Sequence, residues 1–216
     1  MTPGRQPVSP ELVHALGALR AGTLALAAAG AVSLLPGAPP ARWCLILLAA
    51  AHGPFVRALA WLYRIRPATP SVASARRKVF ARATCTLCLM PFAVFWRDCP
   101  AVGFFAANAL LATVAAMLLL VACLRLARAV ARDEMQAFDA RAAGCAVPLL
   151  FGAIALALAV AYAKAGLLSQ PMDVLLPKLA RLPRSVIFAG LLPHLSCAWA
   201  LRRVRDGLLE ELARKP

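Results

Sequence analysis

Two short motifs combine residue types that could bind a soft metal or exchange thiols. Cys85 and Cys88 form a Cys-x-x-Cys pair in "CTLC", and His194 and Cys197 have the same spacing in "HLSC". Residues three apart on a helix share a face, so each pair presents two neighbouring side chains. Three thiolates and an imidazole could hold zinc or a softer metal, and the Cys-x-x-Cys pair alone could cycle between dithiol and disulfide.

The same four residues could instead be packing residues. Free cysteine often behaves as a small buried hydrophobe, and both motifs lie in apolar runs where a thiolate would be costly. A shared metal site requires the two helix faces to meet. At a rise of 1.5 Å per residue, both pairs lie about 8 to 15 Å from the basic residues that end their apolar runs. Similar depths are therefore expected, and both interpretations stay open.

Three further ionisable side chains could line a polar path. Arg20 interrupts one apolar run, His52 precedes the kink-forming dipeptide "GP" in a second, and His194 lies in a third. Ionisable residues within a membrane often mark a pathway or an internal pair. Arg20 could instead extend its long side chain to the membrane surface. His52 and His194 are also the only mid-membrane histidines, so the four-histidine pattern of a two-haem bundle is absent.

Three other patterns predict contacts rather than catalysis. Cys44 and Cys99 fall near the outer ends of apolar runs, where they could form a disulfide in an oxidising compartment. Small residues that recur every fourth position predict a close-packing face, unless the first run is simply rich in alanine: Gly17, Ala21, Ala25 and Ala29. Basic residues at helical spacing predict a row against lipid head groups: Arg125, Arg128 and Arg132.

The carboxylates form no recognisable catalytic motif. Asp133, Glu134 and Asp139 are the one cluster between apolar runs, and such groups could hold Mg²⁺ with a diphosphate. Asp133 and Asp139 do not share a helix face, however, and paired aspartate-rich motifs are missing. The chain also lacks a glycine-rich phosphate loop and the Gly-x-Ser-x-Gly and His-Glu-x-x-His motifs. The sequence therefore identifies no cofactor and argues against an enzyme.

Composition places the chain in a membrane. Its 216 residues are 62% hydrophobic and 15% charged, whereas soluble domains are about 45–50% apolar and about 25% charged. The apolar residues gather in runs of about 20, the length of a membrane-spanning helix. The net charge of +15 would suggest nucleic acid in a soluble protein, but here the basic residues flank apolar runs. We predict an all-α, polytopic membrane protein that forms one domain over residues 1–216 and binds no nucleic acid.

Six membrane-spanning helices would position the candidate residues. They are predicted at 12–35, 43–63, 79–96, 101–124, 142–163 and 185–201. The link at 125–141 is predicted to form a cytoplasmic amphipathic helix. The proline-interrupted segment 164–184 is predicted to lie on the membrane surface rather than cross it. Four or five crossings remain the alternative, because the second, third and sixth runs are short or contain ionisable residues.

The basic residues predict the orientation, because they concentrate on cytoplasmic loops. With six spans, most of them fall on the side of both termini: Arg5, Arg57, Arg64, Arg66, Arg76, Arg77, Lys78, Arg82, Arg125, Arg128, Arg132, Arg141, Arg202, Arg203, Arg205, Arg214 and Lys215. Fewer fall on the other side: Arg42, Arg97, Lys164, Lys178, Arg181 and Arg184. We therefore predict a protein of the bacterial cytoplasmic (inner) membrane with both termini cytoplasmic.

These features favour a non-enzymatic accessory or scaffold subunit of a membrane complex. It would contact the bilayer, anionic lipid head groups, and other membrane-protein subunits or a second copy of itself. The first alternative is a small transporter or channel that uses Arg20, His52 and His194. The second is an intramembrane metal- or thiol-dependent protein that uses the two cysteine motifs.

Overall fold

The computed structural model describes residues 8–35, 37–65, 69–181 and 183–214. Within these ranges the protein is all-helical. Its elements are α1 (Pro10–Leu34), α2 (Ala41–Arg64), α3 (Pro70–Asp98), α4 (Gly103–Val130), α5 (Glu134–Lys164), the short 3-10 helix η1 (Leu167–Ser169), α6 (Met172–Ala180), α7 (Arg184–Ala189) and α8 (Leu191–Ala213). Six segments are long and apolar enough to cross a membrane, with α7 and α8 forming the sixth. The predicted class, a polytopic helical membrane protein, is confirmed.

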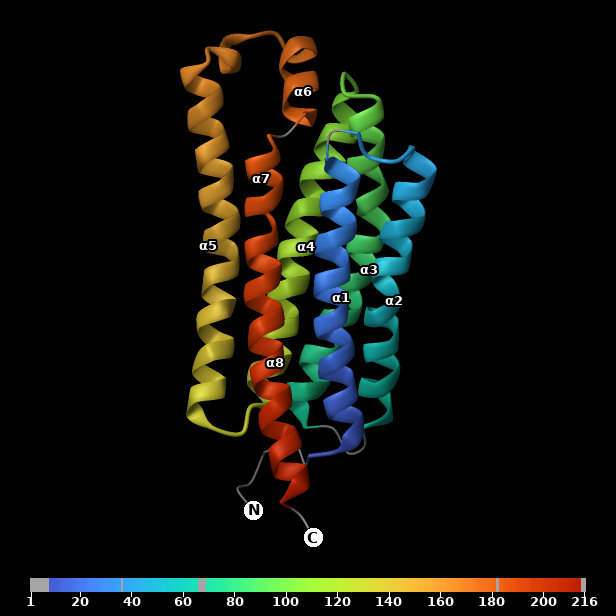
Figure 1. The fold of residues 1–216 in the computed structure, drawn as a ribbon, viewed down its shortest axis with the longest axis vertical. Coiled ribbons are helices and arrows are strands. Elements are labelled where there is room, and N and C mark those ends of the chain that lie inside the picture. Colours follow the sequence, from blue (N-terminus) through green and yellow to red (C-terminus); the bar gives the residue numbers. More distant parts are fainter. Residues whose placement is uncertain (1–7, 36, 66–68, 182, 215–216) are drawn as a thin grey trace.

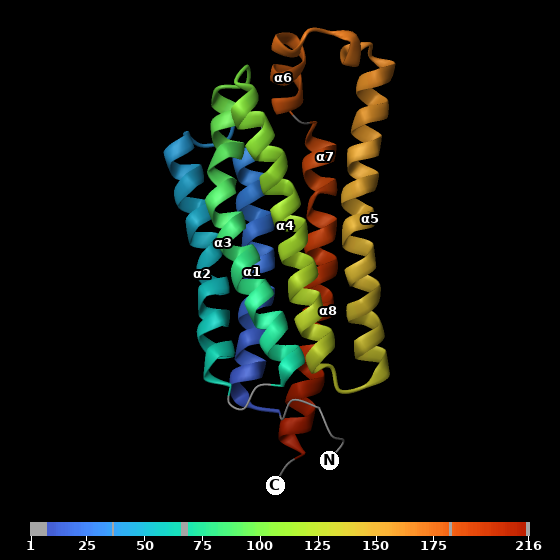
Figure 2. The same cartoon turned by 180° about the vertical axis from the view of Figure 1, so that it is seen from behind.

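The helices run up and down, so that consecutive spans are antiparallel (Figures 1 and 2). The described chain begins and finishes at the same end of the bundle, which we call the terminal end. α2 and α4 end there and α3 and α5 begin there, whereas α1, α3 and α5 end at the opposite end, which we call the distal end. α3 packs chiefly against α4, and α1 packs against α2 and α8. α5 packs against α4 and α8.

Most helices extend beyond the spans predicted from the apolar runs. α3, for example, begins at Pro70 and not near residue 79. Arg76 explains this extension, because its Nη1 donates to the Leu62 carbonyl at 3.1 Å and its guanidinium lies 4.1 Å from the Tyr63 ring centre. Basic residues next to the apolar run therefore continue the helix and join it to α2.

The predicted amphipathic linker helix at 125–141 is wrong. α4 continues straight to Val130, and α5 begins at Glu134 after a short break. Asp133 is the reason for this boundary: its carboxylate accepts a hydrogen bond from the Gln136 backbone N–H at 2.6 Å and so caps α5. The residues of the link are divided between two spanning helices and do not form a third one.

The segment 164–184 forms a short distal cap. α6 has 9 residues, and at 1.5 Å per residue it is too short to cross a bilayer. Pro171 precedes α6 and Pro183 precedes α7, whereas Pro177 lies inside α6 and does not break it. α6 packs against the distal parts of α3 and α4.

Large side chains concentrate in the terminal half of the bundle. Fully buried leucines and one phenylalanine fill the space between α1, α2, α4 and α8: Leu12, Leu16, Leu19, Phe55, Leu62, Leu119, Leu120, Leu124, Leu201 and Leu208. In the distal half, α4 instead presents small buried residues, Ala106, Ala109, Ala112 and Ala116. This change from large to small side chains leaves the distal half less completely filled.

Candidate functional site

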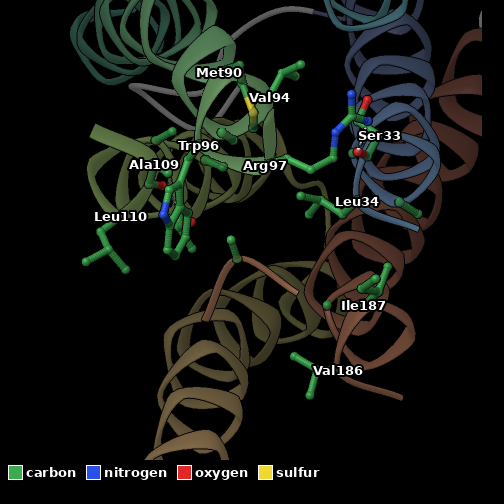
Figure 3. A pocket seen from close by; sticks show the side chains of 18 of the residues that line it. Ser33, Leu34, Met90, Val94, Trp96, Arg97, Ala109, Leu110, Val186 and Ile187 are labelled. Carbon is green, nitrogen blue, oxygen red and sulfur yellow. Dashed lines mark hydrogen bonds between the residues drawn. The ribbon is translucent and has the colours of Figure 1, made fainter. Parts of the chain in front are cut away.

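An apolar cleft occupies the distal half of the bundle. Its volume is about 400 Å³, and it is partly open to the outside. Side chains from α1, α3 and α4 form one side, and those from α5, α6, α7 and the start of α8 form the other. Figure 3 shows Trp96 beside Ala109 and Leu110, with Val186 and Ile187 of α7 across the cleft. The cleft follows directly from the small residues of α4, together with Gly30 and Ala31 of α1.

Few polar groups line the cleft. The Arg97 side chain extends toward Ser33 (Figure 3), and its Nη1 donates to the Ser33 carbonyl at 3.0 Å. Its Nε forms an ion pair with Asp98 at 2.8 Å. Ser33 Oγ is buried and has no hydrogen-bond partner among the described atoms. His194 is 8% exposed, and its Nδ1 lies 3.2 Å from the Gly190 carbonyl oxygen. The cleft therefore offers a largely hydrocarbon lining with a few hydrogen-bonding groups.

α6 covers the distal end of the cleft. Leu176 is the buried residue of α6, and its Cδ1 lies 3.9 Å from where a Cβ on Gly103 would stand. The Tyr162 hydroxyl donates to the Lys178 carbonyl at 3.2 Å, which ties α6 to α5. A long ligand would therefore enter from the side of the bundle rather than through α6.

The volume of the cleft distinguishes between two kinds of occupant. A helix about 10 Å across displaces about 400 Å³ for each turn of about 5.4 Å, so the cleft has room for about one helical turn. Pockets for single small ligands usually measure about 300–1,000 Å³ and are mostly apolar with a few polar groups. The cleft therefore suits one slender hydrophobic chain better than a partner helix.

A second cavity, which we call the basic crevice, lies nearer the terminal end and measures about 710 Å³. α1 forms its floor between α2 and α8. Its lining residues are Val13, His14, Gly17, Ala18, Ala21, Gly53, Pro54, Arg57, Trp61, Arg205 and Leu209. None of these residues is a carboxylate, so the lining is positively charged.

The structure does not bring the two cysteine motifs together. Cys85 and Cys88 are exposed on α3, whereas His194 and Cys197 are buried. α3 packs against α4 and α2, but α8 packs against α1, α5 and α4. Cys197 Sγ lies 3.7 Å from the Leu120 carbonyl of α4. The four-residue site is not formed, and across the described ranges no three His, Cys, Asp or Glu side chains are grouped to hold a metal ion.

The other predicted sites are also separated. His194 lines the cleft, but Arg20 and His52 line neither the cleft nor the basic crevice. His52 is buried, and its Nδ1 lies 2.7 Å from the Leu48 carbonyl oxygen. Cys44 is buried and donates to the Pro39 carbonyl at 3.3 Å, while Cys99 is exposed, and both thiols are free.

The residues of the predicted small-residue face do not share the same surroundings, and neither do those of the predicted arginine row. Gly17 and Ala21 line the basic crevice, whereas Ala29 is buried in the core and Ala25 packs against it. Arg125 and Arg128 are exposed. Arg132 departs from the predicted row, because its Nε forms an ion pair with Glu211 of α8 at 3.1 Å.

The sequence predicted neither the close contact between α1 and α2 nor the cleft. A Cβ on Gly22 would stand 2.8 Å from Cε2 of Phe55, so α1 and α2 touch at Gly22. The alanines of α4 that recur at helical spacing were the available signal for the cleft: Ala106, Ala109, Ala112 and Ala116. The predicted basic residues Arg5, Arg66 and Lys215 lie outside the described residues.

Comparisons with protein families, curated proteins and solved structures give no match. The cleft, the crevice and the exposed helix surfaces are therefore the features from which we infer a function.

Proposed function

We propose that the protein is a non-enzymatic membrane component that holds one hydrophobic chain of a membrane amphiphile in the apolar cleft. The observation that carries this proposal is a cleft of about 400 Å³, mostly apolar, within helices of membrane-spanning length. An empty cleft would forfeit the dispersion contacts of its lining. Water would find few polar partners there. A lipid chain supplies the missing contacts without that cost.

The polar groups of the cleft support an amphiphile rather than a plain hydrocarbon. Ser33 Oγ is a buried donor without a partner in the described structure, and an ester or hydroxyl oxygen could accept its hydrogen bond. Arg97 lies at the same end but is paired with Asp98, so its charge is largely compensated. The cleft is therefore expected to retain a chain with little preference for the charge of its head group.

Filling the cleft provides the test. Gly30 lines the cleft, and a Cβ there would meet nothing within 4 Å, so Gly30→Leu adds volume without a backbone clash. Gly152 on α5 is equally unobstructed but does not line the cleft, which makes Gly152→Leu the matched control. Native mass spectrometry of the protein in mild detergent counts retained phospholipids.

We expect the parent and Gly152→Leu proteins to retain one more tightly held lipid than the Gly30→Leu protein. The loss should affect phosphatidylcholine and phosphatidylglycerol alike. Equal retention by all three proteins would contradict the proposal.

A second role, as an accessory or scaffold subunit, is supported by the surface of α5. The buried residues of α5 all lie in its first half, and none occurs from Pro148 to Lys164. This part of the helix is apolar and stands apart in Figure 1. We propose that a partner helix, from another subunit or a second copy, packs on its outer face.

Photo-crosslinking distinguishes this surface from ordinary lipid-facing surface. A photoreactive residue at Leu156, which is 65% exposed on α5, should yield a protein adduct in native membranes. The same group at Val56, which is 64% exposed on α2, is the control. Adducts of equal yield at both positions, or at neither, would contradict a partner on α5.

The finer location of the protein is also a proposal. The excess of basic residues at the terminal end supports a cytoplasmic position for both termini in a bacterial inner membrane. Arg125 and Arg128 would then face anionic head groups of the inner leaflet. A transport path through Arg20 and His52 has weaker support, because neither residue lines a cavity with His194.

A further inference from the structure

The basic crevice combines a small-residue floor with basic walls. Gly17 and Ala21 of α1 keep the floor low, because they carry little or no side chain. Arg57 of α2 and Arg205 of α8 line the crevice from the two flanking helices, and Arg205 Cδ lies 3.7 Å from where a Cβ on Gly17 would stand. Two members of the predicted packing stripe, Gly17 and Ala21, therefore line the same cavity as Arg57 and Arg205.

The charge of the crevice is only weakly compensated. Arg205 Nε is buried and makes no hydrogen bond with any described residue, although it lies 3.6 Å from Asp206 Oδ1. Asp206 also pairs with Arg202 at 3.3 Å, so its charge is shared. His14 adds a third basic group, and no carboxylate lines the cavity. Clustered positive charge beside low-dielectric protein attracts an anion strongly.

The crevice also has an apolar side at the expected depth of the head groups. Trp61 stacks with His14 at 5.1 Å between ring centres and lies 4.8 Å from the Arg64 guanidinium. Tryptophan with neighbouring arginine is typical of the boundary between hydrocarbon and head groups. Val13 and Leu209 add apolar surface next to the charges, which suits an amphiphile better than a free anion.

We propose that the basic crevice binds the phosphate of one anionic phospholipid between Arg57 and Arg205, with its glycerol over Gly17. This site is separate from the apolar cleft and does not depend on the function proposed for it. The occupant is recognised by its phosphate and its net negative charge, whereas the cleft recognises a chain.

Lipid titration followed by native mass spectrometry tests the site. The double variant Arg57→Gln/Arg205→Gln should bind phosphatidylglycerol about thirtyfold more weakly, since each arginine near a membrane surface is worth about a fivefold change in binding. Phosphatidylcholine binding should stay unchanged. The control Arg77→Gln/Arg82→Gln removes the same charge from exposed positions of α3 that do not line the crevice. Because exposed charge pairs contribute little, it should change phosphatidylglycerol binding less than about twofold.

A second variant covers the case in which the double variant folds poorly. Gly17→Leu raises the floor and keeps both arginines, so it should also weaken phosphatidylglycerol binding while the helical circular dichroism signal is retained. Gly30→Leu, which fills the cleft, should leave the preference for phosphatidylglycerol over phosphatidylcholine intact. This variant therefore distinguishes a failure of the crevice proposal from a failure of the cleft proposal.

Three results would overturn the proposal. The first is equal affinity of the parent protein for phosphatidylglycerol and phosphatidylcholine. The second is an equal loss of phosphatidylglycerol binding in the crevice variant and in the α3 control. The third is competition by soluble glycerol phosphate at the same concentration as the lipid, which would assign the site to a free phosphate and not to a membrane lipid.

Discussion

Arg97 on α3 donates through Nη1 to the Ser33 carbonyl on α1 at 3.0 Å, and the same Nη1 lies 3.5 Å from Cys44 Sγ on α2. One side chain therefore joins three helices at the distal end. The Ser33 carbonyl belongs to the last turn of α1, where backbone acceptors lack intrahelical partners. Arg97 satisfies one of them and holds α1 and α3 together on one side of the cleft.

Replacing Arg97 by leucine should destabilise the protein by about 2 kcal/mol, since hydrogen bonds to charged groups contribute about 1.5–3 kcal/mol. Arg42→Leu provides the comparison, because Arg42 lies at the same end and its guanidinium is 5.9 Å from the ring centre of the exposed Trp43. Thermal unfolding in detergent measures both changes. Equal thermal unfolding midpoints for the two variants would show that the Arg97 bridge does not stabilise the protein.

The contact between Gly22 and Phe55 predicts a steric effect. A Cβ on Gly22 would come within 2.8 Å of the Phe55 ring, which is 1% exposed. The clash in Gly22→Ala should therefore lower the free energy of unfolding by about 1–3 kcal/mol. The higher helix propensity of alanine offsets roughly 1 kcal/mol of that loss. Unfolding of the purified variant measures the sum of these effects.

Two companion variants isolate that steric cause. Gly53→Ala on α2 meets nothing within 4 Å and should be neutral or stabilising. Phe55→Leu combined with Gly22→Ala should recover part of the loss, as a double-mutant cycle would report. If Gly53→Ala were as harmful as Gly22→Ala, the close approach would not be the cause.

The number of spanning helices was predictable because apolar run length alone determines whether a helix can cross hydrocarbon. Their boundaries were not, because charges such as Arg76 and Lys78 occur inside α3 and do not end it. The linker helix failed for a related reason. Its arginines have helical spacing, but Asp133 caps a new helix, α5, that begins within the predicted linker. The spacing of the arginines gives no information about where such a cap occurs.

The candidate site was harder to predict, because sequence gives the depth of a residue but not the neighbours of its helix. The two cysteine motifs were expected at similar depths, yet α3 and α8 pack against different sets of helices. The small-residue stripe was interpreted by its spacing alone. The actual close contact uses Gly22, which lies one position away from Ala21 and therefore on another side of α1.

The Asp133 cap can be tested without changing any spanning segment. Asp133→Ala removes the acceptor of the 2.6 Å bond from Gln136 N–H, and loss of such a cap costs about 0.5–2 kcal/mol. Asp133→Asn keeps an acceptor and should be nearly neutral. Hydrogen exchange at residues 134–137 should accelerate in the alanine variant alone, and equal exchange in both would contradict a capping role.

Cys99 reports the orientation of the bundle. It follows α3 at the distal end and is exposed, whereas Cys44 at that end is buried. In a protein whose only cysteine is Cys99, a membrane-impermeant maleimide should label intact cells if the distal end faces outward. Labelling that requires permeabilised cells would place both termini outside.

Trp96 offers the most direct measurement of chain binding, because it lines the cleft. The protein should keep Trp96 alone, with Trp43, Trp61 and Trp199 changed to phenylalanine, and should be titrated in detergent with a phospholipid brominated on its chains. We expect saturable quenching of Trp96 by one lipid and loss of that saturable component in the Gly30→Leu variant. Quenching that rises without saturation and is the same in both proteins would contradict the binding of a chain in the cleft.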